Sequence, residues 1–459
     1  MVEAMVDRVR SMSRFSVHGR ATRVVGLVIE ATGLDDVALG ELCRVTSLSD
    51  EHSVLAEVMG FHERGVLLMP LGDMEGIHPG SAVEPMGRTF GVDVGPGLLG
   101  RVLGGLGHPI DGKGDVGPTK RIPLTSEPPN PLHRSQIEVP LETGVRALDG
   151  MLTLGRGQRV GIFAGSGVGK STLLGTIARH SSADVNVIAL LGERGREVRD
   201  FLENALREDG LARSVVVVAT GDEAALIQAR GALVATSIAE YFRDQGKQVL
   251  LMVDSITRVA GAWRQIGLAA GEPPTTKGYP PSVFAALPRL LERAGNSSVG
   301  GISGVYTVLV EGDDFSEPVA DATRSILDGH IVLSRKMSDA GRFPAIDVLA
   351  SKSRVRDSLL SEEERADVNA VARVMSAYRD KEDLISVGAY QPGSSPDVDA
   401  ALRLQTPISD FFLQRPDERS PFADTRSRLA TIASAVGGTT GGKRATTTTG
   451  PGAGEVSVL

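Results

Sequence analysis

One glycine-rich segment constrains this chain more than any other part of it. Residues 161–172 read GIFAGSGVGKST and follow the start of the apolar run 159–163. Glycines at 165, 167 and 169 permit the positive φ angles and the close approach with which successive backbone N–H groups surround an anion. The first turn of a following helix adds about half a positive charge at the same place. The segment therefore predicts a strand, a phosphate-binding loop and a helix, in that order.

Side chains of this loop predict how it would hold ATP. Lys170 is a mobile cation that can reach the β and γ phosphates, and the Ser171 hydroxyl is suited to ligate Mg²⁺. Ala164 stands at the first position, where the stricter form of the motif has glycine. The residues predicted to contact the nucleotide here are Gly165, Ser166, Gly167, Val168, Gly169, Lys170, Ser171 and Thr172.

Composition sets limits on partners and compartment. A length of 459 residues is enough for about three domains with a large core. The net charge of -8 argues against nucleic acid as the main partner, because phosphate neutralisation needs clustered Lys and Arg. Cys43 has no second cysteine to pair with, and no apolar run approaches the length of about 18 residues that spans a membrane. We therefore expect a cytoplasmic protein.

The sequence predicts five regions. They are an amphipathic segment at 1–20, a β-barrel domain at 21–90, a P-loop domain with its connector at 91–360, a helical domain at 361–436 and a disordered tail at 437–459. The first segment is either a helix that docks on a partner or an anionic membrane, or a frayed terminus. The tail lacks the apolar residues that a core needs.

The barrel prediction depends on short β-branched runs between Gly, Asp and Pro, at 24–29, 43–46, 54–59 and 66–69. Some small barrels bind single-stranded nucleic acid on aromatic platforms. Residues 1–90 contain only the aromatic residues Phe15, Phe61 and Phe90, which argues against an RNA-translocating motor.

Beyond the connector, strands and helices alternate as in a mostly parallel sheet. The expected strands are 185–191, 214–219, 248–253 and 305–310, and the expected helices are 197–207 and 224–243. Ligands of such sheets lie beyond the carboxyl ends of the strands. Asp254 closes one strand and is suited to anchor Mg²⁺ beside Ser171.

Glu193 follows another of these strands and could orient the water that attacks the γ phosphate, with Arg194 neutralising the developing charge. Partnership with a helix dipole is the alternative for Glu193.

Several longer motifs resemble the catalytic ATPases related to the rotary ATP synthase β subunit, and among them the flagellum-specific ATPases of type III export. The shared motifs are 192–198 (GERGREV), 254–258 (DSITR), 278–285 (GYPPSVFA), 311–314 (EGDD) and 344–353 (PAIDVLASKS). Residues 26–30, 100–103 and 387–395 favour the flagellar branch, whereas 307–314 and 317–321 lean toward the injectisome branch. The resemblance implies an α/β fold: a RecA-like P-loop ATPase domain between an N-terminal β-barrel and a C-terminal helical domain.

The resemblance also implies roles for single residues. Lys170 and Ser171 would bind phosphate and Mg²⁺, Glu193 would be the catalytic carboxylate, and Asp254 would anchor the metal. Arg194 and Arg258 would lie near the γ phosphate, and Arg354 would be an arginine finger that enters the neighbouring subunit's site. Phe343 would place its ring against adenine, with Tyr390 as the other wall. The family usually has Gln and Glu where this chain has Trp263 and Gln265.

One chain that carries both a P-loop and a finger can satisfy every site only by closing a ring of identical subunits. We therefore expect a homohexamer that hydrolyses Mg-ATP and energises export of flagellar proteins. The resemblance implies stalk and regulator proteins, chaperones and exported substrates as partners, with peripheral contact to the export gate at the inner face of the cytoplasmic membrane. The alternatives are an injectisome ATPase, a nucleotide-binding ring subunit without turnover, which would not need Glu193, and a proton-coupled ATP synthase subunit.

Overall fold

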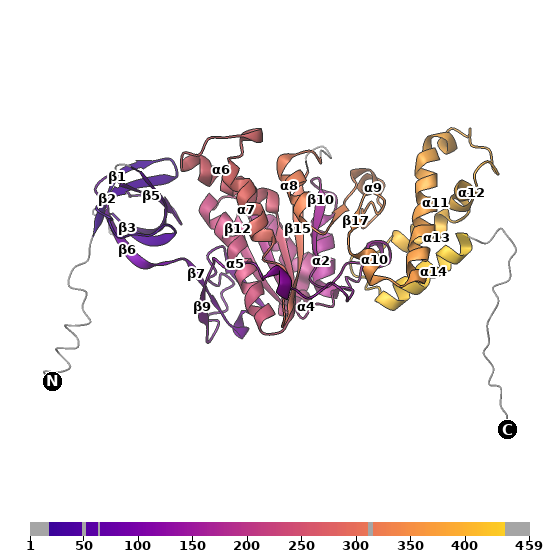
Figure 1. The fold of residues 1–459 in the computed structure, drawn as a ribbon, viewed down its shortest axis with the longest axis horizontal. Coiled ribbons are helices and arrows are strands. Elements are labelled where there is room, and N and C mark those ends of the chain that lie inside the picture. Colours follow the sequence, from indigo (N-terminus) through magenta and orange to yellow (C-terminus); the bar gives the residue numbers. More distant parts are fainter. Residues whose placement is uncertain (1–17, 48–51, 63–64, 311–314, 437–459) are drawn as a thin grey trace, which may run out of the picture.

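The computed structural model describes residues 18–47, 52–62, 65–310 and 315–436, and these form three units in a row (Figure 1). A β-barrel lies at one end, a sheet covered by helices lies in the middle, and a group of helices lies at the other end. This architecture confirms the predicted fold class. The expected amphipathic segment, the tail and the 311–314 motif lie outside the described residues, and the five domain boundaries stay predictions.

The barrel closes in the strand order β1-β2-β5-β4-β3-β6. Its strands are β1 (Gly19–Val25), β2 (Val28–Thr32), β3 (Glu41–Thr46), β4 (Ser53–His62), β5 (Gly65–Pro70) and β6 (Ala82–Thr89). Alternate side chains such as Ile29, Val45 and Leu68 are completely buried inside it. The run 24–29 is not one strand as expected, because it turns at Gly26, where φ is 57°, and Val25 then pairs with Val28.

The central sheet has the order β17-β16-β10-β15-β13-β11-β12-β8, and β14 pairs with β15. Its bounds are β8 (Arg101–Gly104), β10 (Arg159–Ala164), β11 (Val185–Glu193), β12 (Ser214–Thr220), β13 (Gln248–Asp254), β14 (Gly295–Asn296), β15 (Gly301–Leu309), β16 (Gly329–Val332) and β17 (Lys352–Ser353). The strands from β16 to β8 pair in parallel, and β14 and β17 pair antiparallel. The carboxyl ends of β10, β11, β13 and β15 therefore meet at one edge.

The connector does more than wrap the edge of this sheet, as the sequence led us to expect. It contributes β8 as the strand beside β12, and its β7 (Gly91–Val94) pairs with β9 (Lys120–Pro123). Arg101 in β8 donates two hydrogen bonds to Asp111, at 2.8 and 2.9 Å, and the guanidinium holds the pKa of that carboxyl well below its usual range. This ion pair fixes the loop that follows the edge strand.

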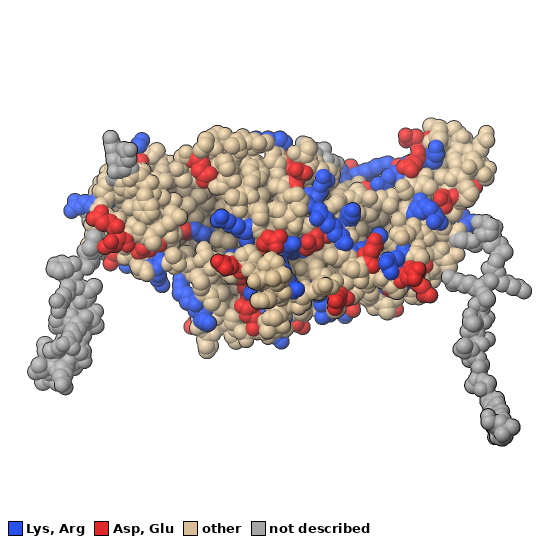
Figure 2. Space-filling view, in the orientation of Figure 1, with Lys and Arg blue, Asp and Glu red and all other residues tan. Residues whose placement is uncertain are grey.

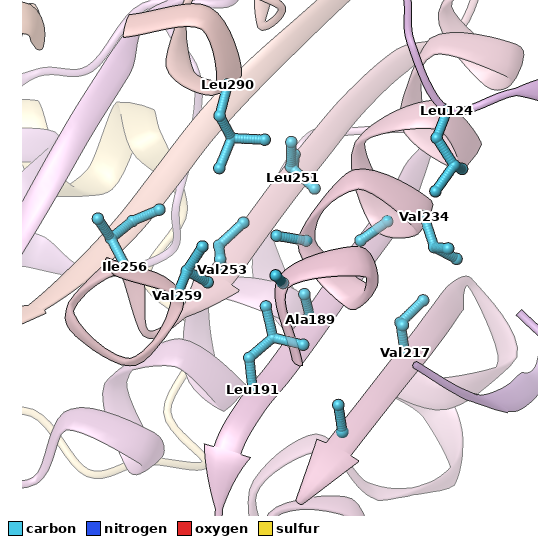
Figure 3. Close-up of a cluster of buried hydrophobic side chains, with 14 of the residues drawn as sticks. Leu124, Ala189, Leu191, Val217, Val234, Leu251, Val253, Ile256, Val259 and Leu290 are labelled. Carbon is cyan, nitrogen blue, oxygen red and sulfur yellow. The ribbon is translucent and has the colours of Figure 1, made fainter. Parts of the chain in front are cut away.

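Helices cover both faces of the sheet (Figure 1). They are α2 (Lys170–His180), α3 (Gly195–Asp200), α4 (Arg207–Ala212), α5 (Ala225–Asp244), α6 (Ile256–Ala269), α7 (Pro281–Leu291), α8 (Pro318–Ile326), α9 (Arg335–Asp339) and α10 (Arg356–Leu359). Figure 3 shows Leu251 and Val253 of β13 directed toward Ile256 and Val259 of α6. Each side chain of this kind stabilises the fold by about 1.5–3 kcal/mol when fully buried.

The C-terminal unit consists of α11 (Glu362–Ser386), α12 (Pro396–Arg403), α13 (Gln405–Phe412) and α14 (Phe422–Val436). The predicted capping box begins α11, with Ser361 and Glu364 each bonding the other's backbone N–H. Val368 and Val371 are buried as expected, and they pack in the same core cluster as α2 and α14. No helix among the described residues is long and apolar enough to cross a membrane.

A buried ion pair joins α5 to the chain after α7. Arg293 bonds both carboxylate oxygens of Glu240, at 2.9 and 2.6 Å, and also bonds the Leu124 carbonyl and the Ser237 hydroxyl. The two charged side chains are only 3% and 6% exposed. We expect Arg293→Ala to cost about 3–5 kcal/mol, because Glu240 would stay buried without a partner.

Thermal unfolding measures this effect, and a loss of this size lowers the Tm by roughly 10 °C. The control is Arg199→Ala, which removes an arginine that is 80% exposed, and the Tm of this variant should not change. Equal Tm values for the two variants would contradict the structural role of Arg293.

Candidate active site

The loop between β10 and α2 has the geometry of an anion cradle. Gly167 and Gly169 adopt φ angles of 79° and 89°, which only glycine accepts easily. Gly165 was expected to need the same freedom, but its φ lies outside that range. A Cβ on Gly165 would instead lie 2.8 Å from Nη2 of Arg335, so space is the reason for this glycine. Val168 is buried in the core and can offer a ligand only its backbone.

Lys170 lies between two carboxylates at the carboxyl edge of the sheet. Its Nζ is 2.5 Å from Oδ1 of Asp254 and 3.4 Å from Oε1 of Glu193, the last residues of β13 and β11. Thr307 in β15 donates a hydrogen bond of 2.7 Å to the same Asp254 oxygen. Three neighbouring strands and the P-loop helix thus place these four side chains together. The sequence analysis did not identify Thr307, although it falls within the expected strand 305–310.

Burial and charge act in opposite directions on the ionisation of this cluster. Burial lowers the pKa of Lys170, but the carboxylates of Asp254 and Glu193 outweigh it, so the net shift is upward. Burial raises the pKa of Glu193 above its ordinary value, Lys170 opposes the rise and Glu197 adds to it. Lys170 therefore stays charged, while Glu193 holds a proton at higher pH than an exposed glutamate does.

Two further predicted arginines lie near this edge. Arg258 packs on Gly192, where an added Cβ would lie 2.9 Å from the arginine Cβ, and Gly192 has a φ of 70°. Arg194 begins α3 and is 85% exposed, with Glu197 at 3.7 Å. Arg258 also lines a cavity of about 670 Å³ over α6, as does Gln265. Trp263 packs partly buried against the core of the domain.

The structure separates Arg354 from the P-loop of its own chain. Its N–H bonds the Asp328 carbonyl at 2.9 Å, and Asp328 in turn bonds the backbone and side chain of Arg159, where β10 begins. The P-loop follows the other end of β10, about 15–20 Å along the strand. Arg354 is exposed at the amino edge of the sheet.

The two predicted aromatic residues lie in different places. Phe343 is 42% exposed, and its ring is 3.4 Å from where a Cβ on Gly169 would be, so it borders the P-loop. The Tyr390 hydroxyl bonds Asp399 at 3.0 Å in the loop between α11 and α12, at the outer end of the helical unit (Figure 1). The described contacts do not bring Tyr390 to Phe343, whose carbonyl instead accepts a hydrogen bond from Gln414. We therefore do not carry Tyr390 forward as a wall of the adenine pocket.

Three family descriptions match successive parts of this chain. Residues 21–87 match the ATP synthase alpha/beta family, beta-barrel domain, and 144–353 match the nucleotide-binding domain of the same family. Residues 360–431 match the T3SS EscN ATPase C-terminal domain. The three matched segments fall on the barrel, the central sheet and the C-terminal helices.

Relatives of known name match nearly the whole chain. The flagellum-specific ATP synthase of Bacillus subtilis (strain 168) is 48% identical, over 94% of this chain and 98% of its own. The type 3 secretion system ATPase of Xanthomonas euvesicatoria is also 48% identical, over 90% and 94%. The structure of the assembled ATPase EscN with its central stalk EscO, from enteropathogenic E. coli, superposes with a TM-score of 0.84 at 42% identity, over 90% of this chain and 100% of that one.

The Lys170 cluster predicts a pH-dependent effect on stability. We expect Lys170→Met to destabilise the protein by about 3 kcal/mol at pH 8, because Asp254 and Glu193 lose their shared cation. Without Lys170 the pKa of Glu193 in the folded state rises further above its unfolded value. That contribution to stability is therefore present at low pH and lost as pH rises through the folded pKa.

Thermal unfolding at pH 5 and pH 8 should show a smaller deficit at pH 5. Arg194→Met, which removes a largely exposed cation from the same region, should leave the Tm unchanged at both values. A deficit of the same size at both pH values would contradict the role assigned to Glu193.

Proposed function

This chain belongs to the ATP synthase α/β family, among the flagellum-specific and type III secretion ATPases, and we propose that its own site hydrolyses Mg-ATP to energise export of flagellar proteins. The observation that carries this proposal is the convergence of Lys170, Glu193 and Asp254 at the carboxyl edge of the sheet. A subunit that only held nucleotide would need the lysine and no second carboxylate beside it.

The donors present at this edge suit Mg²⁺. The Asp254 carboxylate and the Ser171 hydroxyl are hard oxygen ligands of the type that Mg²⁺ prefers. Asp254 lies 2.5 Å from Lys170, the residue before Ser171, and Thr307 orients it. When bound with ATP, Mg²⁺ neutralises charge on the β and γ phosphates. We propose that Lys170 then exchanges its contacts with carboxylates for contacts with phosphate.

Glu193 is placed to act on water. Release from Lys170 leaves its carboxylate, which closes β11, facing the γ-phosphate end of the cradle, where it can accept a proton from the attacking water. Arg258, which packs on Gly192, is suited to hold the phosphate that develops negative charge. Arg194 is largely exposed and could reach either this site or an adjoining subunit. Phe343 is suited to cover the adenine ring.

Arg354 supports a ring. It lies at the opposite edge of the sheet from its own P-loop, so it can serve as a finger only in a neighbouring subunit. Identical subunits that each give a finger and receive one must close on themselves. We propose a homohexamer, and the EscN relative is likewise described as an assembled ATPase.

Partners and location follow from the same family membership. We propose that a central stalk protein enters the ring, as EscO does with EscN. Regulators, chaperones and exported proteins would bind the assembly in the cytoplasm, at the inner face of the membrane next to the export gate. The injectisome function remains the second candidate, because the Xanthomonas secretion ATPase is as similar to this chain as the Bacillus flagellar relative.

Glu193→Gln tests the catalytic proposal. The substitution keeps size and hydrogen bonding but removes the base, so we expect hydrolysis to fall about 10²–10⁴-fold. Binding of a fluorescent ATP analogue should be retained. In the source cells, the same variant should stop assembly of flagellar filaments at normal protein levels. Retained hydrolysis would contradict the base assignment, and normal filaments with failed secretion of other proteins would favour the injectisome.

Mixed rings test the finger. Lys170→Ala removes the site but keeps Arg354, whereas Arg354→Ala keeps the site and removes a contribution worth about 10³–10⁵ in turnover. Each variant alone should be nearly inactive. Co-assembled rings should regain activity, because an intact site then lies beside an intact finger. Full turnover of Arg354→Ala alone would show that the finger lies elsewhere.

A further inference from the structure

We infer that Arg335 is a positioning residue of the P-loop that sets the affinity for the triphosphate. This inference rests on the proposed function and adds a residue that no sequence motif indicated. Arg335 is the first residue of α9, and its Nη2 donates a hydrogen bond of 3.3 Å to the Ser166 carbonyl. Ser166 lies in the first half of the phosphate cradle, between the glycines at 165 and 167.

The direction of this hydrogen bond explains why it matters for an anion. A cradle attracts phosphate through inward N–H groups, and a carbonyl that turned inward would repel the same phosphate. A guanidinium that holds the Ser166 carbonyl keeps that oxygen turned toward α9. The loop is then arranged before ATP arrives, so less binding energy is lost in ordering it.

Gly165 gives independent support for this contact. Its backbone does not require glycine, since its φ lies outside the left-handed range. A Cβ there would approach Arg335 Nη2 to 2.8 Å, while its next nearest contact outside this side chain, the Val310 carbonyl, would be at 3.8 Å. Arg335 is therefore the one close neighbour that an alanine at 165 would displace.

The segment that carries Arg335 also reaches the other end of the cradle. Phe343, eight residues later, borders Gly169. The next residue on α9, Lys336, points elsewhere and pairs with Glu382 of α11 at 2.9 Å. Neighbouring cations on one helix thus have different partners, which provides a matched control.

The affinity for nucleotide tests this role, and it can be measured without turnover. We expect Arg335→Ala to weaken binding of fluorescent ATP and of ADP about tenfold, the loss typical of one charge-assisted hydrogen bond. The KM should rise by a similar factor with kcat within about twofold, because the contact does not change in the transition state. Arg335→Lys should recover part of the affinity, and Lys336→Ala should bind as the wild type does.

A double-mutant cycle and a second probe locate the effect. Gly165→Ala should weaken binding in the wild type and add little to Arg335→Ala, because the clash has then gone. Competition by inorganic tripolyphosphate should weaken as much as ATP does. Additive losses, unchanged tripolyphosphate binding, or an equal loss in Lys336→Ala would overturn the inference. If the wild type bound ATP and showed the Arg335 effect but hydrolysed nothing, the proposed function alone would fail.

Discussion

The active site depends on one buried cation held between two carboxylates. Lys170 comes from the helix after β10, Asp254 from the end of β13 and Glu193 from the end of β11, and only a parallel sheet brings these ends to one edge. In a partly buried place, each charge is tolerated because the others compensate it. The same arrangement keeps the lysine ready to exchange carboxylate for phosphate.

Position in the sheet also divides labour between subunits. The P-loop lies at the carboxyl edge and Arg354 lies at the amino edge, beside the start of the same strand β10. One rigid sheet therefore offers a site at one edge and a finger at the other. Figure 2 shows positive and negative side chains interspersed over one face of the molecule, with lysines and arginines gathered over its middle part. Such a surface suits contacts with charged groups of neighbouring subunits.

A single segment links these two edges. After β16 the chain places Arg335 against the first half of the cradle and Phe343 against its end, and it then returns along β17 to Arg354. Asp347 and Lys336 of the same segment pair with Arg379 and Glu382 of α11. The nucleotide pocket, the finger and the C-terminal helices thus share one stretch of about 20 residues.

The sequence by itself determined the fold class, the P-loop and the acids that end β11 and β13, because these features depend on local spacing and on apolar runs. It could not determine contacts between distant segments: the edge strand β8, the hydroxyl of Thr307 on Asp254, or the space that Arg335 needs at Gly165. The run 24–29 showed no sign of its turn beyond Gly26, and Tyr390 resembled a pocket wall until its hydroxyl was found on Asp399. Only tertiary structure decides such pairings, because they depend on which strands become neighbours and not on spacing along the chain.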